Sequence, residues 1–229
     1  MTTPTSTPGA RRIELVERVL EANDAVAAGT RADLVARGIF SIDLIGAPGS
    51  GKTALLEATL RALRERPDAP TPAVLVGDLT TQRDGDRLAR WCDQVVQIST
   101  GQGCHLEAAE VRAAIGEVAL DDVGLLLVEN VGNLICPVGF DLGLSTTVGL
   151  FSVTEGDDKA AKHPYLVEEA DLLLLNKVDL LPYVSFDLAL FRADVERLHP
   201  GVPVLEVSAT TGHGMGAWLD WLLGRAGRG

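Results

Sequence analysis

Three side chains in two glycine-containing segments could bind a transition metal. Cys104 and His105 stand side by side in STGQGCHLEA, after the third expected strand, and Cys136 stands in ENVGNLICPVGFD, after the fourth. If these two parallel strands are neighbours, as we expect, both segments lie at the same edge of the sheet. Two thiolates and an imidazole form a soft to borderline ligand set that suits Zn²⁺, Ni²⁺ or Cu(I). A four-coordinate shell needs one more ligand, which water or a second copy of the chain could supply. The spacing matches no zinc-finger pattern, so an ordinary buried cysteine and a surface histidine remain the alternative interpretation.

A second segment has the residue types that hold nucleotide phosphates. Residues 46–53 read GAPGSGKT, which fits G-x-x-x-x-G-K-[ST], and they stand between an expected strand and an expected helix. Glycines let backbone N–H groups approach the phosphates, and the helix N-terminus adds its dipole. Lys52 is expected to reach the β- and γ-phosphates, as a catalytic residue, and Thr53 to bind Mg²⁺. The candidate nucleotide-binding residues here are Gly46, Gly49, Ser50, Gly51, Lys52 and Thr53.

Two carboxylates follow expected strands and could complete a magnesium site. Asp78 stands in VGDLTTQRD, and Glu129 ends the strand in LLLVENVGN. A carboxylate at a strand end near the phosphate loop can hold Mg²⁺ directly or through water. Asp78 could also act in catalysis by orienting the attacking water. Arg83 has no sequence feature of a catalytic arginine and is expected in solvent.

The base is predicted to be guanine. Asn176, Lys177 and Asp179 form an N-K-x-D segment at the end of the strand DLLLLNK. A carboxylate in this motif pairs with the N1 and N2 donors of guanine, a donor pair that adenine lacks. A later segment resembles the loop whose backbone contacts guanine O6, and its residues are Ser208, Ala209 and Thr210. Both segments could instead be plain surface turns, but their order after residues 46–53 favours GTP and GDP as ligands.

Apolar strands alternate with helical stretches from residue 39 onward. The expected strands are IFSIDLIG, AVLVGD, QVVQIS, GLLLVEN, VGLFSVTE, DLLLLNK and VPVLEVSA. This alternation predicts a doubly wound α/β fold, a mostly parallel sheet with helices on both faces, of the P-loop NTPase type. We expect a disordered tip over residues 1–10, a short N-terminal helical extension over 11–37 that packs on the domain or on a partner, and a GTPase domain over 38–229.

Composition excludes several classes of function. The net charge of −12 and the absence of a basic patch argue against nucleic acid as a partner. No apolar run is long enough to span a membrane, and the N-terminal residues do not resemble a secretory signal. The three cysteines are too few for a disulfide framework, so we expect a reducing cytoplasm. Cys92 is expected in the core, and no role is assigned to His163, His199 and His213.

Taken together, these segments resemble the HypB family of GTPases, which assist nickel insertion into [NiFe] hydrogenase. The resemblance covers residues 39–223, and GCHLEA and ENVGNLICP are its specific segments. It implies slow GTP hydrolysis, a homodimer favoured by GTP, and a nickel or zinc site made by Cys104, His105 and Cys136. It also implies hydrogenase-maturation proteins and the hydrogenase large subunit as partners.

The chain also departs from this family. Some members have a cysteine-rich or histidine-rich N-terminal motif, whereas residues 1–38 contain neither Cys nor His. Two alternatives therefore stay open at this point. One is a related GTPase that serves another metalloenzyme, for example urease, and the other is a metal carrier whose nucleotide site is only structural.

Overall fold

The structure is a computed structural model that describes residues 8–78, 83–101 and 103–227, with the side chains of these residues from residue 20 onward except that of Asp78. Its centre is a seven-stranded sheet in which all paired strands are parallel, in the order β3-β2-β4-β1-β5-β6-β7. The strands are β1 (Phe40–Gly46), β2 (Thr71–Asp78), β3 (Val95–Ser99), β4 (Val123–Glu129), β5 (Thr146–Ser152), β6 (Leu172–Asn176) and β7 (Val204–Glu206). All seven predicted strands and the doubly wound fold class are confirmed.

One face of the sheet is covered by three helices, α2 (Lys52–Arg64), α3 (Arg83–Leu88) and α8 (Met215–Ala226). Strand side chains alternate between the faces, so Ile42 and Leu44 of β1 point to this side and pack with Leu56 of α2. Trp218 of α8 is fully buried there, and its Nε1 donates to Thr59 Oγ1 at 2.8 Å. These contacts fix α2, whose first residues belong to the phosphate loop.

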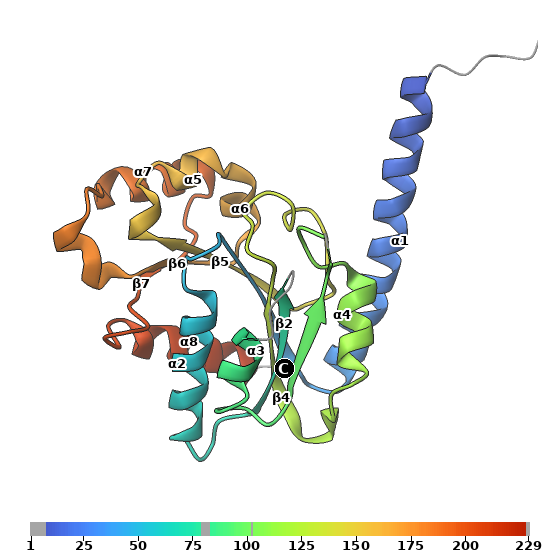
Figure 1. Ribbon diagram of the computed structural model, residues 1–229, viewed down its shortest axis with the longest axis horizontal. Helices are drawn as coiled ribbons and strands as arrows, with labels where there is room; N and C mark the ends of the chain where they lie inside the picture. The colour runs from blue at the N-terminus through green and yellow to red at the C-terminus, as the bar shows by residue number, and fades with distance from the viewer. Residues whose placement is uncertain (1–7, 79–82, 102, 228–229) are drawn as a thin grey trace, which may run out of the picture.

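The other face is covered in two halves (Figure 1). On one half, α1 (Pro8–Ala36) and α4 (Ala108–Ile115) pack over β2 and β4, where Leu34 and Val111 are buried. On the other half, α6 (Pro164–Glu169) and α7 (Leu188–Leu198) pack over β5 and β6, together with α5 (Lys159–Lys162). Short 3₁₀ turns complete the chain: η1 (Leu120–Asp122), η2 (Val153–Glu155) and η3 (Val178–Tyr183). Burial on both faces explains the nearly continuous apolar composition of the strands.

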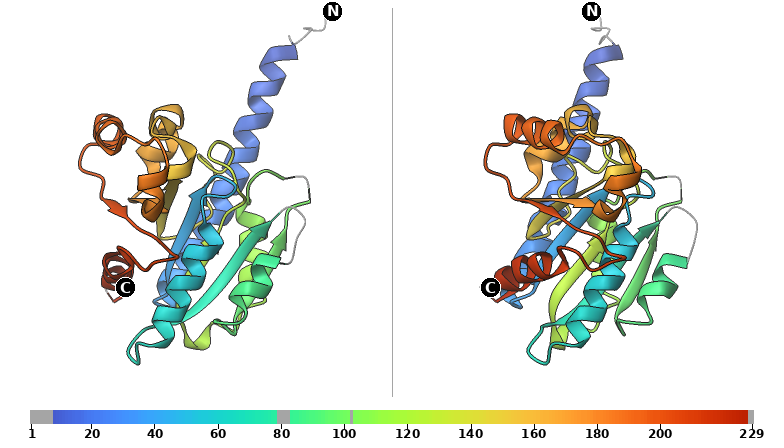
Figure 2. Two further views of the ribbon diagram at one scale, coloured as in Figure 1. Left: turned by 60° about the vertical axis from the view of Figure 1, so that its left-hand side comes forward. Right: turned by 90° about the vertical axis from the view of Figure 1, so that its left-hand side faces the viewer.

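The N-terminal extension is one continuous helix, α1. It begins at Pro8, so residues 8–10 belong to the helix rather than to the expected tip, and residues 1–7 lie outside the described residues. Its second half packs on the domain, with Ala27 and Leu34 almost fully buried. Its first half extends beyond the body of the domain in all three views (Figures 1 and 2). The predicted packing on the domain is therefore confirmed for the second half.

The loops that could do chemistry meet at the carboxyl edge of the sheet. β1 is the central strand. β2, which follows it in the chain, lies on one side of β1, and β5 lies on the other side. Loops that leave neighbouring strand ends in opposite directions open a crevice at the end of β1, where doubly wound sheets bind their ligands. No helix within the described residues is long and apolar enough to cross a membrane.

Candidate nucleotide and metal sites

The phosphate loop joins β1 to α2 in the conformation that its glycines allow. Gly49 and Gly51 have φ angles of 78° and 100°, which side chains with a Cβ rarely adopt. A Cβ on Gly51 would also lie 2.5 Å from Nδ2 of Asn176. The Lys52 Nζ lies 3.1 Å from the Gly46 carbonyl and is buried, and the buried Ser50 hydroxyl has no hydrogen-bond partner. The loop therefore surrounds a cationic group with inward-facing polar atoms, as phosphate binding requires.

Glu129 lies next to Thr53 at this loop, as the predicted magnesium site requires. The Thr53 hydroxyl donates to Glu129 Oε1 at 2.9 Å, and the other carboxylate oxygen is buried without a partner. Burial raises the pKa of Glu129 to about 7, although Lys52 and Thr53 act in the opposite direction. A divalent cation would stabilise the ionised form of this carboxylate, so the two residues fit such an ion.

The predicted third magnesium residue, Asp78, ends β2 at the same edge, where its backbone pairs with Ser99. Its side chain lies outside the part of the chain that the structure describes, so its predicted roles in catalysis and magnesium binding stay predictions.

The base-recognition segments lie against the phosphate loop. The Asn176 side chain donates from Nδ2 to the Ser50 carbonyl at 2.9 Å, and its Oδ1 accepts from the Ala209 N–H at 3.4 Å. Lys177 adopts a left-handed φ of 61°, and its Nζ donates to the Gly49 carbonyl at 2.6 Å. Asn176 thus connects the phosphate loop, the segment after β6 and the segment after β7 by hydrogen bonds. The fold brings the predicted guanine-binding residues to one place, while their individual roles stay predictions.

The remaining residues of these segments have different exposures. Asp179 is half-buried in η3, at the start of the turn that follows β6. Ser208 is buried, and its hydroxyl accepts from the Thr211 N–H at 3.1 Å, whereas Thr210 is exposed. The Asp179 carboxylate is therefore exposed enough to contact a nucleotide base. The Ser208 hydroxyl stabilises the turn that contains it.

The sequence did not indicate the arginine that borders the phosphate cavity. The cavity has a volume of about 460 Å³, and its lining includes Lys52, Thr53, Glu129 and, from α3, Asp84 and Arg87. The Arg87 guanidinium lies 2.7 Å from a Glu57 carboxylate oxygen of α2. Its place beside the cavity depends on how α3 packs against α2, which no local motif indicates.

Two loops bring the three predicted metal ligands near one another, but not into an arrangement that would hold a metal ion. The Cys104 Sγ lies 3.6 Å from the His105 Nδ1. The neighbouring Cys136 thiol, followed by burial, raises the pKa of Cys104. The His105 ring lies against Phe140 with centroids 4.0 Å apart, and its Nε2 is buried without a partner. Within the described residues, no group of three or more His, Cys, Asp or Glu side chains is arranged to hold a metal ion.

One sequence expectation about this cluster was wrong. The third and fourth strands are not neighbours in the sheet, because β2 lies between β3 and β4. Their loops meet nevertheless, since all the strands end at the same edge. The Asn133 side chain, in the loop after β4, donates from Nδ2 to the Cys104 carbonyl at 3.3 Å.

A buried polar pair lies behind both sites. Asp43, in β1, accepts from Nδ2 of Asn130, with distances of 3.1 Å and 3.2 Å to its two carboxylate oxygens. The Asn130 Oδ1 accepts from the N–H groups of Leu106 at 3.2 Å and Val131 at 2.9 Å. Asn130 therefore joins the strand before the phosphate loop to the segment after His105. Burial raises the pKa of Asp43 to about 7.

The other cysteine and histidines are not part of the cluster. Cys92 is buried and its thiol lies 3.2 Å from the Pro72 carbonyl, as expected for a core residue. His199 contacts the Val167 carbonyl through Nδ1 at 2.9 Å, in the α6–α7 region.

Comparison with known proteins shows the family to which this chain belongs. The family described as CobW/HypB/UreG, nucleotide-binding domain, matches residues 41–206. The chain is 43% identical over 212 residues to the hydrogenase maturation factor HypB of Escherichia coli K12. The match covers 93% of this chain and 72% of that protein. It belongs to the HypB family.

Other relatives and solved structures agree. The probable hydrogenase maturation factor HypB of Methanocaldococcus jannaschii is 36% identical, over 92% of this chain and 94% of that protein. The crystal structure of HypB from Archaeoglobus fulgidus has a TM-score of 0.83 at 38% identity and covers 90% of this chain and 100% of that one. The structure of Helicobacter pylori HypB in complex with nickel has a TM-score of 0.84 at 33% identity, over 90% of this chain and 96% of that one.

Proposed function

We propose that this protein is a GTP-hydrolysing metallochaperone that binds nickel and delivers it during [NiFe] hydrogenase maturation. The observation that carries the proposal is the approach of the Cys104, His105 and Cys136 cluster to the phosphate loop at one edge of the sheet. The name of the Escherichia coli relative, a hydrogenase maturation factor, supports the process, and the nickel complex of the Helicobacter pylori protein supports the metal.

The nucleotide part of the proposal assigns GTP as substrate and Mg²⁺ as cofactor. Lys52 contacts the β- and γ-phosphates, and Thr53 and Glu129 hold the ion, which neutralises charge on the transferred phosphoryl group. Asp78 orients the attacking water. Asp179 accepts from guanine N1 and N2, and the turn at Ser208, Ala209 and Thr210 contacts the base through its backbone.

The metal part of the proposal requires two copies of the chain. Each chain brings two thiols and one imidazole, so a shell of four ligands lacks one member, and the proposal takes it from a second chain rather than from water. We therefore infer a twofold homodimer that is favoured by GTP and shares nickel at its interface. Zn²⁺ accepts the same ligand set.

Asn133 supports a direct link between nucleotide state and metal affinity. Its N–H donates to the Gly46 carbonyl at 3.1 Å, and its side-chain oxygen accepts from the N–H groups of Ile135 at 2.9 Å and Cys136 at 3.4 Å. Its amide nitrogen also reaches the Cys104 carbonyl. A shift of the phosphate loop on hydrolysis would therefore move both cysteine segments. A typical coupling free energy of about 1–3 kcal/mol would let one state load nickel and the other release it.

Partner recognition is proposed for the first half of α1. We expect this protein to contact other maturation proteins in the cytoplasm and to pass nickel to the hydrogenase large subunit. Removing residues 1–19 tests the contact, because it spares Asn23 and Leu34, which are buried against the domain. Unchanged nickel-dependent binding to maturation proteins after that deletion would contradict this role.

The function is tested by light scattering after gel filtration. Purified protein is run with GDP or a non-hydrolysable GTP analogue, each with and without Ni²⁺, and phosphate release from GTP is measured alongside. The proposal expects a dimer with the analogue and Ni²⁺, and loss of bound metal in Cys104→Ala. Cys92→Ala removes a thiol outside the cluster and serves as the control. A monomer under every condition would rule out the shared metal site, and binding of GTP without hydrolysis would favour the carrier with a structural nucleotide site.

A further inference from the structure

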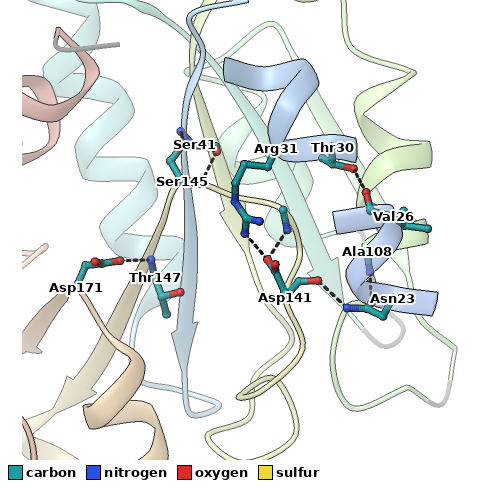
Figure 3. A network of polar contacts seen from close by, with 11 residues as sticks. Asn23, Val26, Thr30, Arg31, Ser41, Ala108, Asp141, Ser145, Thr147 and Asp171 are labelled. Atoms are coloured by element: carbon teal, nitrogen blue, oxygen red, sulfur yellow. Dashed lines mark hydrogen bonds and ion pairs between the residues drawn. The ribbon is translucent and has the colours of Figure 1, made fainter. Parts of the chain in front are cut away.

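One buried side chain of α1 bridges the two loops that bring the metal ligands. The Asn23 amide donates from Nδ2 to the Asp141 carbonyl at 2.7 Å, and its Oδ1 accepts from the Ala108 N–H at 2.9 Å (Figure 3). Ala108 is the first residue of α4, just after the Cys104–His105 segment, and Asp141 belongs to the loop that contains Cys136. Asn23 is 9% exposed, so both hydrogen bonds are shielded from water.

The bond to Ala108 satisfies a group that the helix itself leaves open. The first N–H groups of a helix have no partner within the helix, and Ala108 is fully buried. The capping box of α4, made by Glu107 and Glu110, serves other N–H groups of the first turn. Asn23 therefore supplies the acceptor that Ala108 needs, and its loss would leave a buried donor unsatisfied.

A second set of contacts holds the Cys136 loop on the same helix. The Arg31 guanidinium lies 2.6 Å from Asp141 Oδ1 (Figure 3). The same oxygen also accepts from the Gly143 N–H at 2.8 Å. A Cβ on Gly143 would lie 2.3 Å from the Ala27 carbonyl, so the loop and helix backbones are in close contact there. The loop is thus fixed on α1 a few residues beyond Cys136.

We propose that Asn23 is a positioning residue of the metal site, which sets the distance between the Cys104–His105 segment and the Cys136 loop. This inference rests on the proposed metal-binding function. It assigns to the second half of α1 a role inside the protein, separate from any partner contact of the first half. Asn23 touches neither the metal ligands nor the phosphate loop directly, so its effect is confined to loop geometry.

The test measures Ni²⁺ affinity by competition with a chromophoric chelator, GDP affinity with a fluorescent analogue, and the absorption of the Co²⁺-substituted full-length protein. We expect Asn23→Ala to weaken Ni²⁺ binding roughly tenfold, the lower range for partners that orient metal ligands, and to alter the Co²⁺ spectrum. Affinity of the metal-free protein for GDP should stay within about twofold, since the side-chain hydrogen bonds of Asn23 go to Asp141 and Ala108 and not to the phosphate loop. Asn23→Asp keeps the acceptor for Ala108 but loses the donor to Asp141, so its loss should be roughly threefold.

Thr30→Val is the matched control. Thr30 is buried in the same helix, but its hydroxyl bonds only to the Val26 carbonyl of α1 at 3.1 Å. The proposal expects wild-type metal affinity and an unchanged Co²⁺ spectrum from this variant. Equal losses in Thr30→Val and Asn23→Ala, or a fall in GDP affinity as large as that for Ni²⁺, would show a general effect of α1 packing and overturn the proposal.

Two further outcomes separate this inference from the proposed function. If wild-type protein binds Ni²⁺ through Cys104 and Asn23→Ala binds it equally well, the positioning role is wrong while the metal site stands. If wild-type protein binds no Ni²⁺, the metal site itself is wrong, and the positioning role fails with it. Should Asn23→Ala not fold, the isosteric Asn23→Asp decides by the same measurements.

Discussion

The raised pKa of the buried Asp43 carboxylate predicts how the free energy of unfolding changes with pH. Asp43 is 5% exposed, and its pKa is raised from 3.8 to about 7 by burial, against the effect of its hydrogen bonds from Asn130. An acid with a raised pKa binds its proton more tightly in the folded state. The bound proton of Asp43 therefore adds its full amount to the free energy of unfolding below the ordinary pKa of 3.8. This amount is lost as the pH rises through about 7.

The size of this effect follows from the two pKa values. Between pH 5 and pH 8, a shift to about 7 removes about 2.5 kcal/mol from the free energy of unfolding, at about 1.4 kcal/mol per pH unit. Glu129, whose pKa is likewise about 7 in the folded state, contributes a similar loss of about 2.5 kcal/mol. Glu155, with a pKa raised by burial, acts in the same direction, whereas His163, with a pKa lowered by burial, acts in the opposite one.

The assay is urea unfolding of nucleotide-free protein at pH 5 and pH 8, for wild type, Asp43→Asn and Glu129→Gln. Each variant removes one titrating group and leaves the other residues unchanged, so the decline between the two pH values should be smaller than in wild type by about 2.5 kcal/mol. The contributions of Glu155 and His163 are common to all three proteins and cancel in the comparison. A decline in Asp43→Asn equal to that of wild type would refute the assignment of this effect to the buried carboxylate.

Other substitutions test the nucleotide site and the core. Asp179→Asn should lower the preference for GTP over a nucleotide whose base lacks the guanine N2 donor, measured by competition binding, because an amide replaces the carboxylate acceptor; an unchanged preference would place the base elsewhere. Gly51→Ala should abolish nucleotide binding in a fluorescence titration, since its Cβ would meet Asn176 at 2.5 Å and its φ is 100°; wild-type affinity would contradict this geometry. Trp218→Phe should lower the free energy of unfolding by about 1–3 kcal/mol, because it leaves the buried Thr59 hydroxyl without its indole donor; a smaller change in urea unfolding would mean that water replaces the donor.

Local patterns were sufficient for the strands and the phosphate loop. Alternating apolar runs predicted all seven strands because burial on both faces of a parallel sheet constrains nearly every strand position. The loop of residues 46–53 was predictable because its glycines and Lys52 act through their own backbone conformation and reach. The start of α1 was not, because the Thr, Pro and Ser content near residue 10 does not mark where the helix begins.

The sequence by itself indicated which groups could do chemistry: a phosphate loop, a carboxylate predicted to bind guanine, and two thiols with an imidazole. Only the tertiary structure decided how these groups are connected. Strand order places β2 between the two strands that lead to the metal ligands, and Asn23, Asn130 and Asn133 join loops that are far apart along the chain. A single asparagine produces no periodic pattern and no motif in the sequence, so its hydrogen-bond partners cannot be predicted from it. They are defined only in the folded protein, where packing removes water from the side chain and each of its polar atoms needs a partner.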